Sequence, residues 1–415
     1  MSGTSYATAR QIFADWGLDT ETAMTRLLEI PISLHCWQGD DVGGFERQRG
    51  LSGGGIQATG NHPGRARNPD ELRADLEFAF DLIPGRHRLN LHACYLDTDE
   101  TPDRDALELR HFLPWVDWAR GHGLGLDFNP TFFAHPKADD NLTLSHPDSG
   151  IRSFWVEHGR RSREIAAGIG EALGSAAVNN IWVPDGSKDI PVDRMAARQR
   201  LEQSLDAMLT PALPPAQIVD AVESKLFGIG VEAMTVGSHE FYLGYAIRKK
   251  LALCLDMGHF HPTESVADKL SACALSVERL LLHVSRPMRW DSDHVILLND
   301  DILAMTQELV FAGLLPKTSI GLDFFDATIS RTAAWVIGTR NMQKALLRAL
   351  LLPQERLKAA EAAMDYTARL ILSEEAKDLP FGVVWAELCA RAGMPCGGAL
   401  LGELQRYQAN VAGRG

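Results

Sequence analysis

The chain has 415 residues, of which 45% are hydrophobic and 23% charged, and its formal net charge is −13. This composition is typical of a globular protein with a sizeable core, and the negative charge argues against nucleic acid as a partner. No stretch reaches the roughly 18–20 apolar residues of a membrane span, the first residues lack the pattern of a signal peptide, and the six cysteines have no paired spacing, so we expect a reduced protein in the cytoplasm, with no membrane partner.

The N-terminal part of the chain is predicted to be a helix, a strand and a long loop. Apolar residues recur at helical spacing over residues 6–29, and residues 31–37 have the composition of a first strand. A glycine-rich loop with almost no apolar periodicity follows over residues 38–68. A loop of this length is either a functional lid or a loose insertion. Its place directly after a strand favours a lid.

A second helix has clear start and stop signals. Asn68 is a good N-cap, Pro69 suits the first helical position, and Glu71 completes a capping-box pattern. Residues 72–83 then carry one apolar stripe, and Pro84 with Gly85 ends it. We predict a helix that packs this stripe against a core.

Eight short apolar runs alternate with stretches long enough for a helix. They cover residues 31–37, 88–95, 124–129, 179–184, 218–223, 251–256, 280–284 and 319–325. Such alternation predicts parallel strands, and eight strands close a barrel. A doubly wound sheet is the competing fold, but it would spread the polar residues at the strand ends over a wide crevice. We therefore predict the α/β class, as a (β/α)8 TIM barrel over residues 1–350.

The remaining residues, 351–415, predict helices without strands. They are rich in alanine, leucine and glutamate, with Trp385 and Leu388 as apolar anchors. This C-terminal helical extension either makes subunit contacts or caps the barrel of its own chain.

Acidic and imidazole side chains gather at the ends of the later strands. The candidate metal ligands are Glu223, Asp256, His259, His283, Asp291, Asp293 and Asp323. Each has an ordinary alternative when taken alone, such as a salt bridge from Glu223 to Lys225, a core histidine at His283 or a helix cap at Asp323. A buried cluster of carboxylates, however, requires a cation. Because barrel active sites lie at this end of the strands, we expect two divalent ions there.

The oxygen and nitrogen donors, without thiolate, indicate which ions fit. They suit Mn²⁺, with Zn²⁺, Co²⁺ or Mg²⁺ acceptable at one of the two sites, and Asp256 is the best candidate to bridge them. Two close cations activate water and polarise neighbouring oxygens, which favours a small-molecule substrate with vicinal oxygens. The alternatives are a two-metal TIM-barrel hydrolase or endonuclease, and a sugar-binding protein without catalysis.

Long stretches of the sequence resemble the L-rhamnose isomerase family, within the xylose-isomerase-like barrel group. They are residues 35–41 (HCWQGDD), 55–61 (GIQATGN), 220–230, 258–264 (GHFHPTE), 283–294 and 321–327 (GLDFFDA). The resemblance extends from about residue 10 to the C-terminus, although the tail beyond Leu351 diverges. It implies a (β/α)8 barrel, a homotetramer and the reversible conversion of L-rhamnose, an aldose, into L-rhamnulose.

The same resemblance divides the candidate ligands into two sets. Residues Glu223, Asp256, His283 and Asp323 match the family's structural metal ligands. The catalytic set is matched by His259, Asp291 and Asp293, with Asp256 shared between the sets. No ligand position departs from the family pattern.

We expect isomerisation by a metal-mediated 1,2-hydride shift, with proton transfer through an enediol as the rival mechanism. Asp293 would hold the water that moves a proton between O1 and O2. Lys225 would neutralise charge on the carbonyl oxygen, and His92 would open the ring or orient its C1 end.

Apolar residues are expected to bind the rest of the sugar. Trp37, Phe133 and Trp182 would form a wall for the ring face and the 6-methyl group. Ile56 would close over the substrate from the glycine-rich lid.

Overall fold

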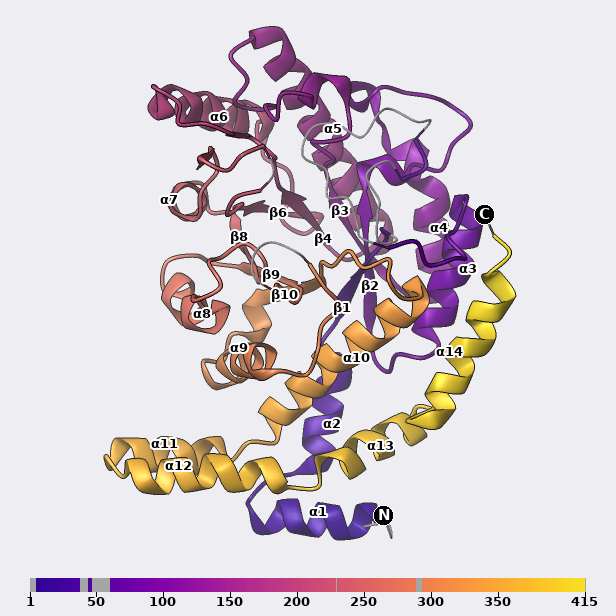
Figure 1. Ribbon diagram of the computed structural model, residues 1–415, viewed down its shortest axis with the longest axis vertical. Coiled ribbons are helices and arrows are strands. Elements are labelled where there is room, and N and C mark those ends of the chain that lie inside the picture. The colour runs from indigo at the N-terminus through magenta and orange to yellow at the C-terminus, as the bar shows by residue number, and fades with distance from the viewer. Residues whose placement is uncertain (1–4, 38–43, 47–59, 229, 289–292, 415) are drawn as a thin grey trace.

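The protein is an eight-stranded parallel barrel surrounded by helices (Figure 1). The structure, a computed structural model, describes residues 5–37, 44–46, 60–228, 230–288 and 293–414. The barrel strands are β1 Ile32–His35, β2 His87–His92, β3 Gly125–Asn129, β4 Ala177–Ile181, β6 Ile218–Glu223, β8 Ala252–Asp256, β9 Leu280–Val284 and β10 Thr318–Leu322. They close in the order β1-β10-β9-β8-β6-β4-β3-β2. The predicted fold and the predicted strands are confirmed.

The N-terminal segment forms two helices, α1 Tyr6–Asp15 and α2 Thr20–Glu29, so the prediction of one helix over residues 6–29 was wrong. Gly17 breaks the helix because its φ is +78°, in the left-handed region that favours glycine. Asp19 then caps α2 by accepting a hydrogen bond of 2.9 Å from Glu21 N.

Helix α3, Pro69–Phe80, begins where the sequence signals predict. The side chain of Asn68 accepts from Glu71 N at 2.9 Å. The carboxylate of Glu71 accepts from Arg67 N at 2.8 Å rather than from the N-cap residue. The buried residues of α3 are Leu72, Asp75, Leu76 and Ala79, so the predicted apolar stripe does face the core.

The remaining helices around the barrel lie between successive strands, except α10, which follows the last strand. They are α4 Leu113–His122, α5 Ser149–Leu173, α6 Arg194–Met208, α7 His239–Lys249, α8 Val266–Ala274, α9 Asp300–Phe311 and α10 Arg331–Leu350. Because these helices cover the outside, most strand residues are buried, which explains the short apolar runs.

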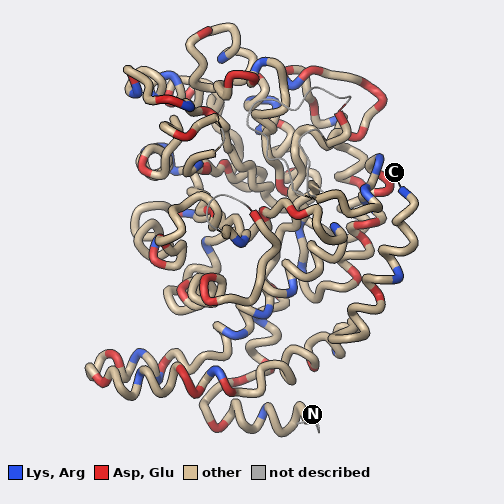
Figure 2. The backbone as a smooth tube through the Cα atoms, viewed as in Figure 1, with Lys and Arg blue, Asp and Glu red and all other residues tan. Residues whose placement is uncertain are grey.

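Four helices follow the barrel: α11 Gln354–Ala362, α12 Tyr366–Glu375, α13 Phe381–Arg391 and α14 Gly398–Val411. Helices α11 and α12 project from the body as a pair, and α13 and α14 run back along it (Figure 1). Tyr407 of α14 stacks on Phe78 of α3 with ring centroids 3.9 Å apart. Acidic and basic residues are interspersed along these outer helices (Figure 2). The boundary at residue 350 stays a prediction.

The inside of the barrel has an apolar and a polar part. The apolar part contains Val178, Ala221, Ala252, Cys254 and Leu281. In the polar part, Asp127 lies in the middle of β3, where its carboxylate accepts from Arg88 at 2.8 Å and from Ser33 Oγ at 2.7 Å. Asp127 is therefore an ion-pair residue inside the barrel.

Two further observations concern the chain as a whole. Within the described ranges, none of the helices is long and apolar enough to cross a membrane. None of the six cysteines, all of which lie in the described part of the chain, forms a disulfide, and five of them are buried.

Candidate metal centre and active site

Four candidate ligands come from the carboxyl ends of four neighbouring strands. Glu223 and Asp256 are the last residues of β6 and β8, His283 lies near the end of β9, and Asp323 directly follows β10. The register pairs Asp256 with His283 and His283 with Gly321. Because inward and outward positions alternate along a strand, this register directs all four side chains into the mouth of the barrel.

The imidazole of His283 stands at the centre of this group. Its Nδ1 lies 3.3 Å from Glu223 Oε2, 3.6 Å from Asp256 Oδ2 and 3.0 Å from Asp323 Oδ2. One ligand atom from each of the four residues lies within 4.8 Å of the others. Ligand atoms about 2.1–2.4 Å from a single ion are separated by at most about 4.2–4.8 Å. The spacing therefore fits one shared divalent cation.

The hydrogen bonding of these residues supports the same conclusion. Buried polar atoms are normally paired, yet Glu223 Oε1, Asp256 Oδ2, His283 Nδ1 and Asp323 Oδ1 have no hydrogen bond in the described part of the chain. The opposite oxygens of two carboxylates are held: Asn180 Nδ2 donates to Glu223 Oε2, and Gly258 N donates to Asp256 Oδ1 at 2.6 Å. Each carboxylate is thus oriented with one oxygen left for a cation.

The electrostatics of the cluster reflect crowded charges in a buried place. Burial, together with the charges of Glu223 and Asp323, raises the pKa of the Asp256 carboxyl to about 7. Burial opposes protonation of His283, but the negative groups around it raise its pKa well above the usual range. Burial also opposes ionisation of Glu223, but the imidazoles of His283 and His259 hold its pKa well below normal. Positive charge is therefore favoured at this point of the barrel.

The second predicted ligand set lies partly beside the first. His259 Nδ1 is 3.1 Å from Glu223 Oε1. Asp293 is buried and lines the same cavity as His259, with a positive φ of 38°. Asp291 lies outside the described residues. The structure thus brings two of the three predicted catalytic ligands to the first set.

These residues line a cavity with about 560 Å³ of empty space, part of it open to solvent. This size is typical of small-molecule sites. Its lining residues are His92, Asn129, Pro130, Phe133, Asn180, Trp182, Glu223, His259, His283, Asp293, Asp323 and Phe325. Carboxylates and imidazoles thus share one cavity with a group of aromatic rings.

The aromatic residues of the site lie in two layers. Phe133 and Trp182 both line the cavity, with ring centroids 5.9 Å apart. Trp37 is buried behind them: it stacks on Phe325 at 5.6 Å and meets the ring of His92 at 4.9 Å. Trp37 therefore supports cavity-lining residues rather than lining the cavity itself.

Four lining residues were not predicted from the sequence as site residues: Asn129, Pro130, Asn180 and Phe325. Two of them carried a usable signal. Asn180 lies two residues before Trp182, and Phe325 lies two residues after Asp323. Residues two apart in extended chain point to the same side, so each shares the side of a predicted site residue. Ile56, predicted to close the site, lies outside the described residues.

His92 and Lys225 have different surroundings. His92 is half-buried, and its Nδ1 lies 3.0 Å from Thr131 Oγ1. Desolvation in this position lowers the pKa of its imidazole to about 3, so the ring is neutral at ordinary pH. Lys225 follows the end of β6, and its ammonium lies 4.8 Å above the centre of the Trp182 ring. This is the geometry of a cation–π contact.

Comparison with known proteins identifies the relatives of this chain. The family model for L-rhamnose isomerase matches residues 2–414. L-rhamnose isomerases of Salmonella paratyphi A and Salmonella newport are each 57% identical to the chain over 403 residues, which is 97% of this chain and 96% of theirs.

Solved structures with a similar arrangement are more distant. An L-ribulose 3-epimerase gives a TM-score of 0.47 at 11% identity over 69% of this chain and 92% of its own. Endonuclease IV from Thermus thermophilus gives 0.42 at 14% identity over 66% and 93%. The sequence matches along nearly the full length decide the assignment: the chain belongs to the L-rhamnose isomerase family, and it is an aldose–ketose isomerase.

Proposed function

We propose that the chain interconverts L-rhamnose and L-rhamnulose with two divalent cations, Mn²⁺ by preference, bound at the mouth of the barrel. The observation that carries this proposal is the convergence of ligand atoms from Glu223, Asp256, His283 and Asp323 within 4.8 Å beside a cavity with aromatic walls. The hydrolase or endonuclease alternative is not favoured, because the relatives that match along the full length are isomerases.

The two ions divide the ligands as follows. The first ion would be held by Glu223, Asp256, His283 and Asp323. The second would be held by His259 and Asp293 together with Asp291, which lies outside the described residues, and Asp256 would be shared. The contact between His259 and Glu223, at 3.1 Å, supports two neighbouring sites. Mixed carboxylate and imidazole donors suit Mn²⁺, and they also accept Zn²⁺, Co²⁺ or Mg²⁺.

When bound, divalent cations polarise adjacent sugar oxygens and lower the pKa of water. Conversion of the aldose moves hydride from C2 to C1 and a proton from O2 to O1. Asp293 holds the water that carries this proton from O2 to O1. Lys225 places positive charge near the carbonyl oxygen, where a site shielded from water strengthens its effect. His92, neutral because it is desolvated, orients the C1 end by hydrogen bonding.

The apolar side of the cavity selects the rest of the sugar. Phe133 and Trp182 contact the ring face and the 6-methyl group, with Trp37 supporting them through Phe325 and His92. The earlier expectation that Ile56 closes over the substrate from the glycine-rich loop, residues 38–68, concerns a residue outside the described part of the chain. A methyl group is apolar, so the aromatic wall favours L-rhamnose over sugars with a hydroxyl at C6.

We also propose a homotetramer in the cytoplasm, with the barrel over residues 1–350 and a helical extension over residues 351–415 that contributes subunit contacts. Apolar side chains exposed on the α11–α12 pair support this role: Met364, Tyr366, Leu370 and Ile371. Six cysteines without a disulfide among them suit a reducing compartment.

The test is ketose formation from L-rhamnose by enzyme treated with chelator and then supplied with Mn²⁺. We expect chelation to abolish the rate, Mn²⁺ to restore it, and Asp291→Asn to remain at least 100-fold slower. A rate unaffected by chelation, or phosphoester hydrolysis without ketose formation, would contradict the proposal. In deuterated water, a direct hydride shift leaves the ketose without carbon-bound deuterium, whereas an enediol introduces it.

A further inference from the structure

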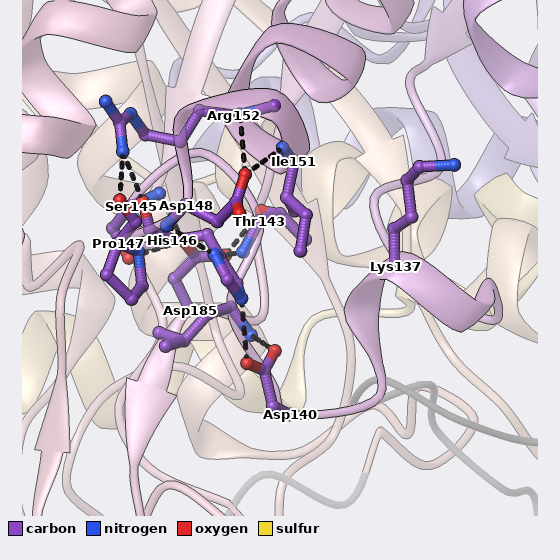
Figure 3. A network of polar contacts seen from close by, with 12 residues as sticks. Lys137, Asp140, Thr143, Ser145, His146, Pro147, Asp148, Ile151, Arg152 and Asp185 are labelled. Carbon is purple, nitrogen blue, oxygen red and sulfur yellow. Dashed lines mark hydrogen bonds and ion pairs between the residues drawn. The ribbon is translucent and has the colours of Figure 1, made fainter.

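A buried carboxylate just outside the cavity fastens one loop to the end of strand β4. Asp185 lies three residues beyond Trp182 and is 2% exposed. Its Oδ1 accepts from Thr143 N at 2.9 Å and from Thr143 Oγ1 at 2.5 Å. Its Oδ2 accepts from Ser145 N at 2.7 Å and from Ser145 Oγ at 2.6 Å (Figure 3). All four donors are directed at one carboxylate, which fixes both its position and its orientation.

The loop that supplies these donors is itself anchored. Arg200 Nε of α6 donates to Ser145 O at 2.7 Å, and Ser204 Oγ of the same helix donates to Leu144 O at 2.7 Å. Helix α6 thus fixes the loop, and the loop fixes Asp185.

The backbone around Asp185 is tied to the segment that carries Lys225. Val236 N donates to Asp185 O at 2.9 Å, and Lys225 N donates to Gly237 O at 3.3 Å. Directly beside the Asp185–Val236 contact, β5 Gly186–Ser187 pairs antiparallel with β7 Met234–Thr235. The segments that follow β4 and β6 are therefore joined at Asp185, and these segments bear Trp182 and Lys225, whose side chains touch.

Packing alone does not require a carboxylate at this position. A buried charge costs several kcal/mol unless hydrogen bonds satisfy it, and apolar side chains of similar volume often hold a core as well. What four directed hydrogen bonds add is geometric precision, which a site needs where neighbouring side chains contact substrate.

We propose that Asp185 is a positioning residue of the isomerase, which holds Trp182 and Lys225 in place and so sets the preference for a methyl group over a hydroxymethyl group at C5 of the sugar. This inference rests on the proposed function, because it assigns Trp182 to the end of the sugar that carries the methyl group.

The test compares Asp185→Asn with wild type on L-rhamnose and on L-mannose, which differs by a hydroxyl on C6. The amide keeps the shape but presents an N–H group to one pair of donors. We expect the ratio of kcat/KM for the two sugars to fall about 10-fold, within the range that one methyl group supplies. A ratio equal to that of wild type overturns the proposal.

Further variants separate positioning from general destabilisation. Thr143→Val should lower the ratio and Thr143→Ser should restore it, because the serine keeps the hydroxyl. Asp220→Asn removes another buried carboxylate, which pairs with Arg163 at 3.0 Å, and should leave the ratio unchanged. If Asp185→Asn does not fold, the Thr143 pair decides: equal ratios in its two variants overturn the proposal.

A double-mutant cycle tests whether Asp185 acts through Trp182. The effects of Asp185→Asn and Trp182→Phe on the ratio should be smaller together than the product of the single effects. If the double variant changes the ratio by the product of the two single effects, the two residues act independently and the proposal is overturned. If the wild-type protein does not convert L-rhamnose, the proposed function fails independently of this inference. A crystal structure of Asp185→Asn then tests the positioning role. We predict that the contact between Lys225 and Trp182 is lost, and an unchanged contact overturns the proposal.

Discussion

Replacing Asp323 by asparagine should remove most of the stability that a divalent metal gives to the folded protein, while changing the metal-free protein little. In the metal-free protein, Asp323 faces the carboxylates of Glu223 and Asp256 with ligand atoms within 4.8 Å. Two unit charges at that distance repel by about 3.5 kcal/mol at an effective dielectric constant of about 20. Because the pKa of Asp256 is about 7, its carboxyl is only partly charged, and the two repulsions together amount to about 3.5–7 kcal/mol. Against these two repulsions stands one attraction, to protonated His283 at 3.0 Å, of about 5.5 kcal/mol.

Because these terms nearly cancel, neutralising Asp323 should change the metal-free stability by no more than about 1–2 kcal/mol. The metal-loaded protein behaves differently. At a metal concentration of about 1,000 times Kd, binding stabilises the fold by about 4.1 kcal/mol. Replacing a residue that only orients a metal ligand weakens binding about 10–100-fold, so we take the upper figure, about 100-fold, for a direct ligand. The same metal concentration then gives about 1.4 kcal/mol. We therefore expect the gain from metal to shrink by about 2.7 kcal/mol.

The assay is urea unfolding of wild type and Asp323→Asn, each with chelator and with Mn²⁺ at one fixed concentration. Asp220→Asn is the control, since Asp220 is a buried carboxylate on the side of β6 that faces Arg163 of α5. The control should keep the full metal-dependent gain, whatever its own stability. A gain in Asp323→Asn equal to that of wild type would refute the reasoning, because it would mean that Asp323 does not bind the ion.

Three further predictions concern stability. Glu46→Gln leaves the fully buried guanidinium of Arg104 without its counter-charge, so the free energy of unfolding in urea should fall by about 3–5 kcal/mol; a loss below about 1 kcal/mol, as for an exposed pair, would contradict it. Burial lowers the pKa of His158 from 6.5 to about 3. Between these two pH values His158 is protonated in the unfolded chain but neutral in the folded protein, so the free energy of unfolding falls as the pH drops from 6.5 towards 3. His158→Asn should therefore reduce the slope of unfolding free energy against pH by about 1.4 kcal/mol per unit between pH 6 and 4, and an unchanged slope would be the contrary result. A methyl group on Gly170 of α5 would lie 1.9 Å from a backbone carbonyl oxygen, so Gly170→Ala should lower the free energy of unfolding in urea by about 1–3 kcal/mol. Gly121 has open space around it, and Gly121→Ala should not destabilise the protein. Equal effects of the two substitutions would show that the contact at Gly170 relaxes freely.

The barrel strands could be predicted from the sequence because most of their residues are buried, which gives each strand a short run rich in apolar residues even where polar ones interrupt it, as in β2 and β6. The break between α1 and α2 was missed, although Gly17 and the N-cap Asp19 both signal it. Helical spacing continues across the break, so periodicity alone favours a single helix.

The candidate site was predictable as a set of residue types but not as a geometry. Asp127 and Asp323 both belong to strand-like runs, yet Asp127 pairs with Arg88 inside the barrel and Asp323 faces the metal ligands. The difference lies in partners that are far away in sequence, and no local pattern shows them.

Asp185 illustrates the same limit of local patterns. Its donors Thr143 and Ser145 precede it by 42 and 40 residues. The cavity-lining role of Phe325 also depends on neighbours distant in sequence, such as Trp37, which stacks on it from β1's side of the barrel. Only the closed strand order brings such residues together.

The most direct test of the central claim is anomalous X-ray scattering at the manganese edge from crystals grown with Mn²⁺. The account predicts a peak within about 2.0–2.4 Å of ligand atoms of Glu223, Asp256, His283 and Asp323. Crystals of active, manganese-dependent enzyme with no peak among these four residues would contradict it.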